Sequence, residues 1–312
     1  MDNIICVVGP TASGKTALAV ELAKAYNGEV LSCDSMQIYK YMDIGTAKPT
    51  EEEMQGIPHH MIGIADPAEP FSAGKYVEMA DRCLQDILSR GKTCILCGGT
   101  GLYADSLIAG REFSPMPSTG KRESLEREAD EIGTAALLER LRAIDPAAAA
   151  RLHEKDRKRI IRALEIFEET GMTITEHDAL SQSLPAKYHP VWLGLNFAER
   201  SELYRRIDRR VDLMLQAGLM DEIEVLLARG IPKSATALQA IGYKEFIAAM
   251  QGEMTMEAAA DLVRQRSRNY AKRQLTWFRR NPELHWILRQ SGMDAESIFE
   301  LARREIPFFA RQ

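Results

Sequence analysis

Short apolar runs alternate with longer amphipathic segments over the first hundred residues of the chain. The four apolar runs lie at residues 3–8, 29–33, 59–65 and 92–97. The two segments with helical spacing lie at residues 17–26 and 71–90. Short continuous apolar runs are typical of buried parallel strands, and strands that alternate with helices build doubly wound sheets. We therefore predict an α/β fold with a parallel sheet flanked by helices, in which ligands bind at the carboxyl ends of the strands.

The pattern changes near Phe113. Residues 114–118 read Ser-Pro-Met-Pro-Ser, which is typical of a linker, and residues 121–180 are rich in Glu, Arg, Ala and Leu without a strand candidate. A strand pattern returns at 189–195, and residues 199–280 have helical character. A helical block between strand-bearing segments indicates an inserted domain. The predicted domains are an α/β core of residues 1–112 and 186–312 and an inserted all-helical domain of residues 113–185.

Composition places the chain among ordinary globular proteins. Hydrophobic residues make up 45% of its 312 residues, and no stretch approaches the roughly 20 consecutive apolar residues that span a membrane. The chain runs straight into a strand pattern without a leader, so we expect a cytoplasmic protein that binds no membrane. No pattern calls for an obligate partner chain, and we expect a monomer.

Charge and cysteine usage narrow the classes further. The net charge is −5, yet positive residues concentrate at 155–162, 205–210 and 264–280, which favours a local polyanion site over a generally basic surface. Five cysteines, an odd number, argue against a disulfide framework. Cys94 and Cys97 lie three residues apart in a predicted strand, so they face opposite sides and are expected to pack in the core.

The residues after the first predicted strand carry the strongest chemical signal. The phosphate-binding pattern G-x-x-x-x-G-K-[ST] is matched at every fixed position by Gly9, Pro10, Thr11, Ala12, Ser13, Gly14, Lys15 and Thr16. In such a loop, backbone N–H groups and a helix N-terminus surround an anion. Lys15 adds a positive charge, and the Thr16 hydroxyl is placed to ligate magnesium. We predict a P-loop NTPase-like core with Mg²⁺ bound through Thr16.

The second carboxylate that hydrolytic P-loop enzymes place at the end of an apolar strand is missing. The strand at 92–97 ends instead in Gly-Gly-Thr-Gly at 98–101, where glycines permit close approach of a substrate. A carboxylate, Asp34, does follow the second predicted strand, with polar Ser35 and Gln37 beside it. Asp34 fits equally a helix N-cap and a group that accepts a proton, and the residues alone leave both open. A phosphate site facing a carboxylate favours group transfer over hydrolysis.

Motifs along nearly the whole chain resemble those of the tRNA dimethylallyltransferase family. Besides the phosphate loop they comprise, in family order, the segments 34–39, 42–49, 58–60, 98–103, 156–165, 241–245 and 271–279. The resemblance implies transfer of a dimethylallyl group from dimethylallyl diphosphate to N6 of an adenosine, with release of diphosphate. It places that adenosine immediately 3′ of the anticodon, in tRNAs that read codons beginning with U.

The resemblance also implies roles for individual residues. The loop would hold the diphosphate, Asp34 would remove a proton from N6, and Thr100 and Arg210 would lie at the reacting centre. The adenosine would be extracted from the anticodon loop, and basic helices would hold the phosphates of the tRNA stem-loop. The implied tRNA-binding residues are Asp34, Ser35, Met36, Gln37, Thr100, Lys158, Arg159, Ile160, Ile161, Arg162, Arg273 and Trp277.

Three other functions fit parts of the pattern. An adenylate isopentenyltransferase acts on a free nucleotide, which would leave the inserted basic helix unexplained. A P-loop small-molecule kinase would need an adenine site and lid arginines, and the chain has no convincing pattern for either. A non-catalytic RNA-binding protein would need no carboxylate such as Asp34 opposite the loop.

Overall fold

The chain forms two compact units. The computed structural model describes residues 2–111, 119–183 and 185–306. The first unit, here the core unit, comprises Met1–Gly110 and Lys187–Gln312, and the second, here the helical unit, comprises Arg111–Ala186. The predicted linker at 114–118, and with it the predicted boundary after residue 112, lies outside the described residues.

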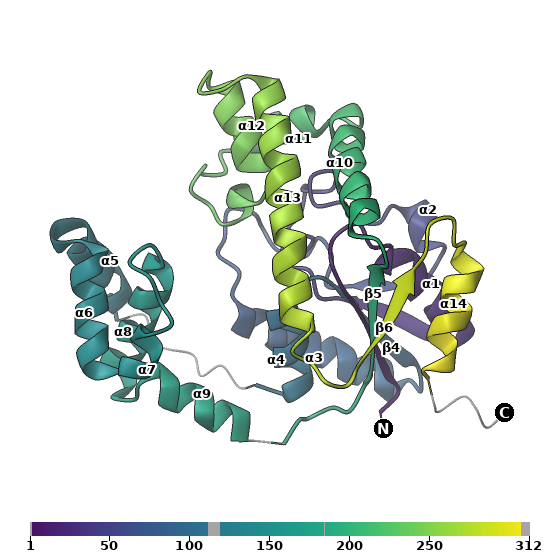
Figure 1. Cartoon of the computed structure of the whole chain (residues 1–312), viewed down its shortest axis with the longest axis horizontal. Helices are drawn as coiled ribbons and strands as arrows, with labels where there is room; N and C mark the ends of the chain where they lie inside the picture. Colours follow the sequence, from purple (N-terminus) through teal and green to yellow (C-terminus); the bar gives the residue numbers. More distant parts are fainter. Residues whose placement is uncertain (1, 112–118, 184, 307–312) are drawn as a thin grey trace. The chain divides into compact units, whose positions relative to one another are not determined.

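A six-stranded sheet forms the centre of the core unit (Figure 1). Its strands are β1 (Ile4–Val8), β2 (Gly28–Ser32), β3 (His59–His60), β4 (Thr93–Gly98), β5 (Val191–Phe197) and β6 (Leu284–Arg289). They are arranged in the order β3-β2-β4-β1-β5-β6, and every neighbouring pair is parallel. The fold class predicted from the sequence is therefore confirmed.

The strand order creates a crevice between β1 and β4. After β1 the chain crosses to β2 on one side, and after β4 it crosses to β5 on the other. Loops that leave two adjacent parallel strands in opposite directions open a crevice at the carboxyl edge, where ligands bind in such sheets. The phosphate loop follows β1, and the loop with Thr100 follows β4, so both predicted site segments meet at this point.

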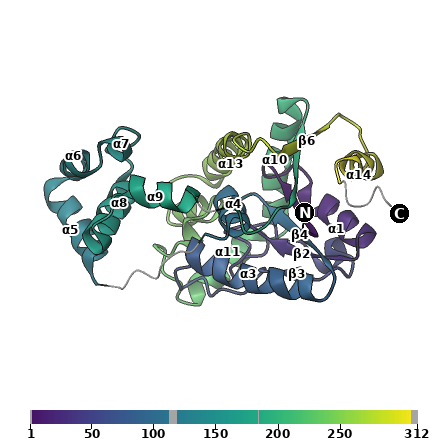
Figure 2. The ribbon, with the colours of Figure 1, turned by 90° about the horizontal axis from the view of Figure 1, so that it is seen from below.

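Helices cover both faces of the sheet. The helices of the core unit are α1 (Lys15–Ala25), α2 (Glu51–Met54), α3 (Ala73–Ser89), α4 (Gly101–Ala109), α10 (Arg200–Gln216), α11 (Leu219–Ala228), α12 (Tyr243–Met250), α13 (Met256–Phe278) and α14 (Ala295–Arg304), with a short 3₁₀ helix, η1 (Ala237–Gln239). No helix in the described ranges is long and apolar enough to cross a membrane. The helix α14 lies beside α1 in both views (Figures 1 and 2).

Alternate residues of the central strands pack into two different cores. Cys94 and Leu96 face a core shared with α3, α4, α12 and α13, whereas Ile95 and Cys97 face a core shared with α1 and α14. The prediction that Cys94 and Cys97 point to opposite faces is confirmed, and all five cysteines are free. Complete burial of β1 and of most of β4 explains why both strands read as continuous apolar runs.

The sequence pattern misjudged the two edges of the sheet. The run at 59–65 forms only the two-residue strand β3, because Met61 and Gly63 adopt left-handed backbone angles (φ 62° and 61°) that end the extended conformation. The edge strand β6 and the helix α14 were not expected. Only two of the six β6 residues are buried, so the strand lacks the continuous apolar run that marks the central strands.

The helical unit has a hydrophobic core of its own. It consists of α5 (Lys121–Ile132), α6 (Thr134–Ile144), α7 (Pro146–Ala149), α8 (Arg157–Thr170) and α9 (Ile174–Ser183). Leu137, Leu141 and Leu164 are at most 1% exposed in this core. Asp145 caps α7 by accepting a hydrogen bond from the N–H of Ala148. A separate core means that the unit does not depend on the sheet for burial of its apolar side chains.

Candidate active site

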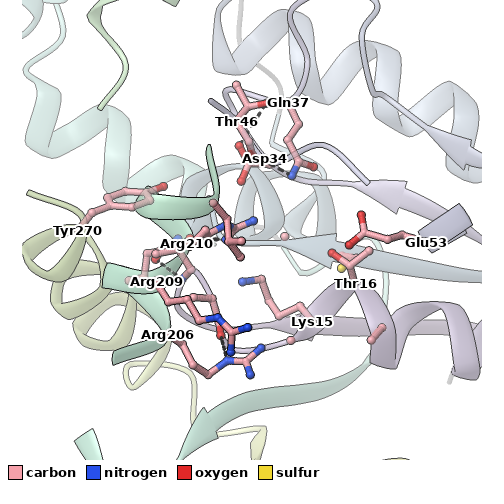
Figure 3. A pocket seen from close by; sticks show the side chains of 18 residues that line it. Lys15, Thr16, Asp34, Gln37, Thr46, Glu53, Arg206, Arg209, Arg210 and Tyr270 are labelled. Atoms are coloured by element: carbon pink, nitrogen blue, oxygen red, sulfur yellow. Dashed lines mark hydrogen bonds between the residues drawn. The ribbon is translucent and has the colours of Figure 1, made fainter. Parts of the chain in front are cut away.

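A cavity of about 470 Å³ opens at the carboxyl edge of the sheet in the core unit (Figure 3). Its size is typical of small-ligand sites. The phosphate loop, the segment after β2, the end of β4 and the helices α10 and α13 contribute its walls. The lining residues are Thr11, Ala12, Gly14, Lys15, Thr16, Ala17, Asp34, Gln37, Thr46, Glu53, Cys97, Gly98, Arg206, Arg209, Arg210, Leu213, Tyr270 and Gln274.

The phosphate loop has the backbone that its sequence predicts. Gly9 and Gly14 have φ values of 143° and 97°, which glycine adopts without steric cost. A Cβ on Gly9 would come within 2.3 Å of the Leu195 carbonyl oxygen, so the loop passes too close to β5 for any other residue. Gly14 is the N-cap of α1 and the helix begins at Lys15, so the positive end of α1 opens on the cavity.

Cationic side chains dominate the wall of the cavity that the phosphate loop and α10 form. Lys15 lies near the middle of Figure 3, and Arg206, Arg209 and Arg210 come from one face of α10. The Arg210 guanidinium donates to the Thr11 hydroxyl at 3.0 Å, and the Lys15 ammonium donates to the Pro10 carbonyl at 2.7 Å. Burial lowers the pKa of both Lys15 and Arg210. An anion between these groups would stabilise their charged forms, which burial disfavours.

Asp34 lies on the opposite wall. Its Oδ1 atom accepts hydrogen bonds from the N–H groups of Met36 (2.9 Å) and Gln37 (3.3 Å), and Oδ2 takes part in neither bond. The Gln37 amide donates to the carbonyls of Thr46 and Ala47, which fixes its side chain beside Asp34. The helix N-cap that the sequence left open for Asp34 is wrong, because a turn and not a helix follows it. Its Oδ1 atom stabilises that turn, and this role coexists with a place in the cavity wall.

Thr100 joins Asp34 through Ser35. The Thr100 hydroxyl accepts from the Ser35 N–H at 3.0 Å and donates to the Ser35 hydroxyl at 3.2 Å. The Thr100 N–H donates to the Cys33 carbonyl at 3.1 Å. These contacts join the end of β2 to the end of β4. The structure thus brings together Asp34, Thr100, Arg210 and the phosphate loop, which are far apart in the sequence.

Oxygen ligands suited to magnesium line the same cavity. The Thr16 hydroxyl and the carboxylates of Asp34 and Glu53 all reach it, and hard oxygen donors are the ligands that Mg²⁺ prefers. No group of three or more His, Cys, Asp or Glu side chains able to hold a metal occurs among the described residues. Few protein ligands suit Mg²⁺, which commonly completes its shell with waters and substrate phosphates. The lining is therefore compatible with a magnesium–diphosphate complex.

The implied tRNA-binding segment on α8 divides into two sets. Lys158 and Arg159 are exposed, and Arg162 is partly exposed. Ile160 and Ile161 are fully buried in the core of the helical unit, so their side chains are unable to touch RNA. The sequence interpretation is corrected for these two residues: they anchor the helix that displays the cations.

Several cations of α13 are engaged within the protein. Arg264, Arg266 and Arg268 pair with Asp212, Glu245 and Asp208, respectively. Ion pairs of this kind hold α13 to α10 and α12, so they are weaker candidates for phosphate contact than sequence clustering suggested. Arg273 is exposed and lies over the ring of Tyr270 at 5.5 Å.

Trp277 has a packing role in the core unit. Its indole N–H donates to Asp105 at 2.7 Å, and its ring lies so close to Gly101 that a Cβ there would meet it at 2.1 Å. Neighbouring Phe278 is only 1% exposed. The aromatic residues at this end of α13 thus fasten the helix to α4.

Three charged residues and one glutamine in the cavity lining were not assigned by the sequence. Arg206 and Arg209 precede Arg210 on α10 at helical spacing, and all three lie in the positively charged run 205–210 of the sequence. Glu53 closes a capping box with Thr50, so its pattern predicted a helix start and nothing more. Gln274 is a buried polar residue on α13, and burial of a single glutamine leaves no local sequence signature.

Comparison with known proteins agrees with the family resemblance of the sequence motifs. Residues 37–281 match the family model described as IPP transferase, and residues 2–65 match that described as isopentenyl transferase. A tRNA dimethylallyltransferase of Caldanaerobacter subterraneus subsp. tengcongensis is 47% identical over 98% of this chain and 99% of its own. Another, of Acetivibrio thermocellus, is 45% identical over 96% of both chains.

Solved structures agree in fold over 97% of the chain. A tRNA isopentenylpyrophosphate transferase of Bacillus halodurans is 42% identical with a TM-score of 0.73, covering 97% of this chain and 95% of its own. A eukaryotic dimethylallyltransferase acting on tRNA is 28% identical with a TM-score of 0.83, covering 97% and 78%. With a family model that matches most of its length and relatives above 40% identity, the chain belongs to the IPP transferase family.

Proposed function

We propose that this chain is a tRNA dimethylallyltransferase that prenylates N6 of the adenosine immediately 3′ of the anticodon in tRNAs that read codons beginning with U. The donor is dimethylallyl diphosphate, and the released product is diphosphate. One observation carries the proposal: a single cavity has a cationic phosphate loop on one wall and Asp34 on the other, and Thr100 is hydrogen-bonded to Ser35 next to Asp34. Relatives with this name are similar over 96% and 98% of the chain.

The donor would lie with its diphosphate on the phosphate loop. Lys15 and Arg210 would bind its oxygens and stabilise the negative charge that grows as the allylic C–O bond breaks. Because burial lowers the pKa of both groups, the diphosphate would also strengthen their protonation. When bound, magnesium would be held by Thr16 and Glu53 and would neutralise part of the diphosphate charge.

The acceptor would enter on the side of Asp34. The N6 amine of adenine is a weak nucleophile because its lone pair is delocalised into the ring. Removal of its proton by Asp34, as the C–N bond forms, would make the attack feasible. Oδ1 is held by the turn at Met36 and Gln37, so Oδ2 is the atom that would receive the proton. Thr100, fixed by Ser35, would orient the amine from the neighbouring strand end.

The helical unit supplies a surface for the tRNA backbone. Lys158, Arg159 and Arg162 project from α8, and phosphate contacts of this type hold a nucleic acid in position without reading its sequence. A free nucleotide would need no such surface. This is the feature that favours tRNA over AMP as the acceptor.

The experiment offers isotope-labelled dimethylallyl diphosphate and magnesium to purified protein, with unmodified tRNA, AMP or ATP in parallel reactions. Label is expected in tRNA, at the adenosine beside the anticodon, and in neither nucleotide. Label in AMP or ATP alone would assign the chain to nucleotide prenylation. Phosphate release from ATP without transfer of label would identify a kinase or hydrolase and overturn the proposal.

A further inference from the structure

Gln274 connects the two walls of the cavity. This side chain from α13 is only 4% exposed, and its two polar atoms have different partners. Oε1 accepts from the N–H of Thr11 in the phosphate loop at 2.8 Å, and Nε2 donates to the carbonyl of Gly99 at 2.9 Å. Gly99 precedes Thr100 in the loop after β4. One amide group therefore holds the phosphate loop and the loop after β4 at a fixed separation.

The residues around the Gln274 amide suit its contact with the Gly99 backbone. A Cβ on Gly99 would come within 2.1 Å of Nε2, so only glycine allows the amide to approach the backbone there. Tyr270, one turn earlier on α13, lines the cavity together with Gln274. A glutamine has an acceptor and a donor at the end of one rigid plane, which suits it to join an N–H and a carbonyl.

We propose that Gln274 is a positioning residue that sets the distance between the prenyl diphosphate and the amine of the acceptor adenosine. The inference rests on the proposed function, because it assigns the donor to the loop of Thr11 and the acceptor to the side of Thr100. Bond formation between two bound groups depends steeply on their separation, and a displacement of about 1 Å can lower the rate about a hundredfold. Both polar atoms of Gln274 are engaged by backbone groups, so we assign it no contact with a reacting atom.

The first test replaces Gln274 with methionine, which keeps the side-chain length and removes both hydrogen bonds. In Gln274→Met we expect kcat to fall about a hundredfold, with the dissociation constants for inorganic diphosphate and tRNA each changed less than about threefold. Exposed Gln251 at the end of α12 provides the matched control, Gln251→Met, with activity like that of the unaltered protein. A kcat of Gln274→Met within threefold of the unaltered protein, or a matching loss of diphosphate binding, would overturn the inference.

A second variant separates lost hydrogen bonds from lost packing. In Gln274→Glu, a neutral carboxyl group is able to accept from Thr11 and donate to Gly99, whereas an ionised one repels the Gly99 carbonyl. The ratio of its kcat to that of the unaltered protein is therefore expected to rise at least tenfold between about pH 9 and about pH 6. The other titratable groups facing the cavity are present in both proteins, so the pH dependence that they give to both divides out of the ratio: Lys15, Asp34, Glu53, Cys97, Arg206, Arg209, Arg210 and Tyr270. A ratio independent of pH would contradict the inference.

Amide hydrogen exchange tests the contact without any substrate. Exchange of the Thr11 N–H is expected to be at least about tenfold faster in Gln274→Met than in the unaltered protein, because its acceptor is gone. Unchanged exchange would count against the inference even if activity were lost. If the unaltered protein transferred no label to tRNA, the proposed function would fail, and the exchange measurement would still report on Gln274.

Discussion

Single side chains in this structure often serve the local backbone and the cavity together. Asp34 closes a turn with Oδ1 and lines the cavity, and Thr100 heads α4 while bonding to Ser35. The sequence located both residues because each follows a recognisable strand. It misassigned Ile160 and Ile161, because a motif match transfers a whole segment, whereas the helical period turns these two residues inward. Motif and periodicity together would have separated them from their basic neighbours.

The base role of Asp34 is tested by the change Asp34→Asn. Asparagine keeps an Oδ1 acceptor for the N–H groups of Met36 and Gln37, so the turn is expected to survive with an unchanged melting temperature. Turnover should fall about a hundredfold or more, with tRNA affinity nearly unaltered, since the amide accepts no proton. Single-turnover rates and tRNA titrations measure the two quantities. Near-normal turnover would remove Asp34 from the proton transfer.

A buried carboxylate far from the cavity makes a separate prediction about stability. Glu29 on β2 is 3% exposed and pairs with Arg90, Lys92 and His60. The hydrogen bonds from Arg90 are the main cause that holds the pKa of Glu29 well below its usual range, against the opposing effect of burial. A lowered folded-state pKa stabilises the protein above the unfolded-state value and loses that contribution as the pH falls through the folded-state value.

Glu29→Gln is therefore expected to lower the free energy of unfolding by about 2 kcal/mol at neutral pH, given the partial exposure of the partners. The difference from the unaltered protein should shrink below about pH 4, where the unfolded-state carboxyl takes up its proton. Denaturant titrations at several pH values measure it. Glu78→Gln, which breaks an exposed pair with Arg82, is the control and should cost less than about 0.5 kcal/mol. An equal loss for both variants at neutral pH would contradict the burial argument.

Helices and strands differ in how clearly the sequence pattern predicts them. The helix α8 ends where the sequence has a glycine, and Gly171 there adopts a left-handed conformation (φ 72°). Apolar β1 and β4 were predicted almost to the residue, because both are buried on two faces. The edge strand β6 escaped notice, although Arg289 at its end donates to the Ser13 carbonyl of the phosphate loop at 2.7 Å. Edge elements lack the continuous apolar pattern, so their contribution to a site appears only in three dimensions.

The exposed cations of α8 are expected to bind tRNA phosphates. Replacing Lys158, Arg159 and Arg162 together with glutamine should reduce the slope of log affinity against log salt by about two, since each lost phosphate contact removes roughly 0.7 to 0.9. The melting temperature should stay nearly constant, because these side chains lie outside the hydrophobic core of the unit. A matched triple of exposed residues, Arg82, Arg303 and Arg304, changed in the same way, controls for net charge. Equal slopes for the two triples would move the tRNA surface elsewhere.

At the scale of the whole molecule, strand order explains why the site lies where it does. The segments after β1 and β4 leave toward opposite faces of the sheet, and the helices α10 and α13 close the crevice with Arg210 and Gln274. Alternating strand and helix patterns predicted the parallel sheet and its ligand-binding edge. Sequence patterns had no means of showing that α13 crosses both loops, because that contact joins residues more than 170 positions apart. The individual site motifs could thus be recognised from short stretches of sequence, whereas the distances between them in the folded chain could not.

The separate core of the helical unit predicts independent folding. The excised segment 111–186 is expected to be helical and to unfold cooperatively on heating, because Leu137, Leu141 and Leu164 pack within it. Leu164→Ala should lower its stability by about 3 kcal/mol through the cavity that it leaves. Circular dichroism follows both. A gradual loss of helix without a transition would show that the unit needs the rest of the chain.

The most direct measurement compares two anticodon stem-loops that differ only at the nucleoside 3′ of the anticodon, one with adenosine and one with purine riboside, which lacks the N6 amine. Each is incubated with labelled dimethylallyl diphosphate, and released diphosphate and transferred label are counted together. Prenyl transfer to N6 predicts equal amounts of label and diphosphate with adenosine, no label with purine riboside, and loss of both signals in Asp34→Asn. Label on the purine riboside stem-loop, or equal transfer by Asp34→Asn, would contradict the assignment of N6 as the acceptor and Asp34 as its base.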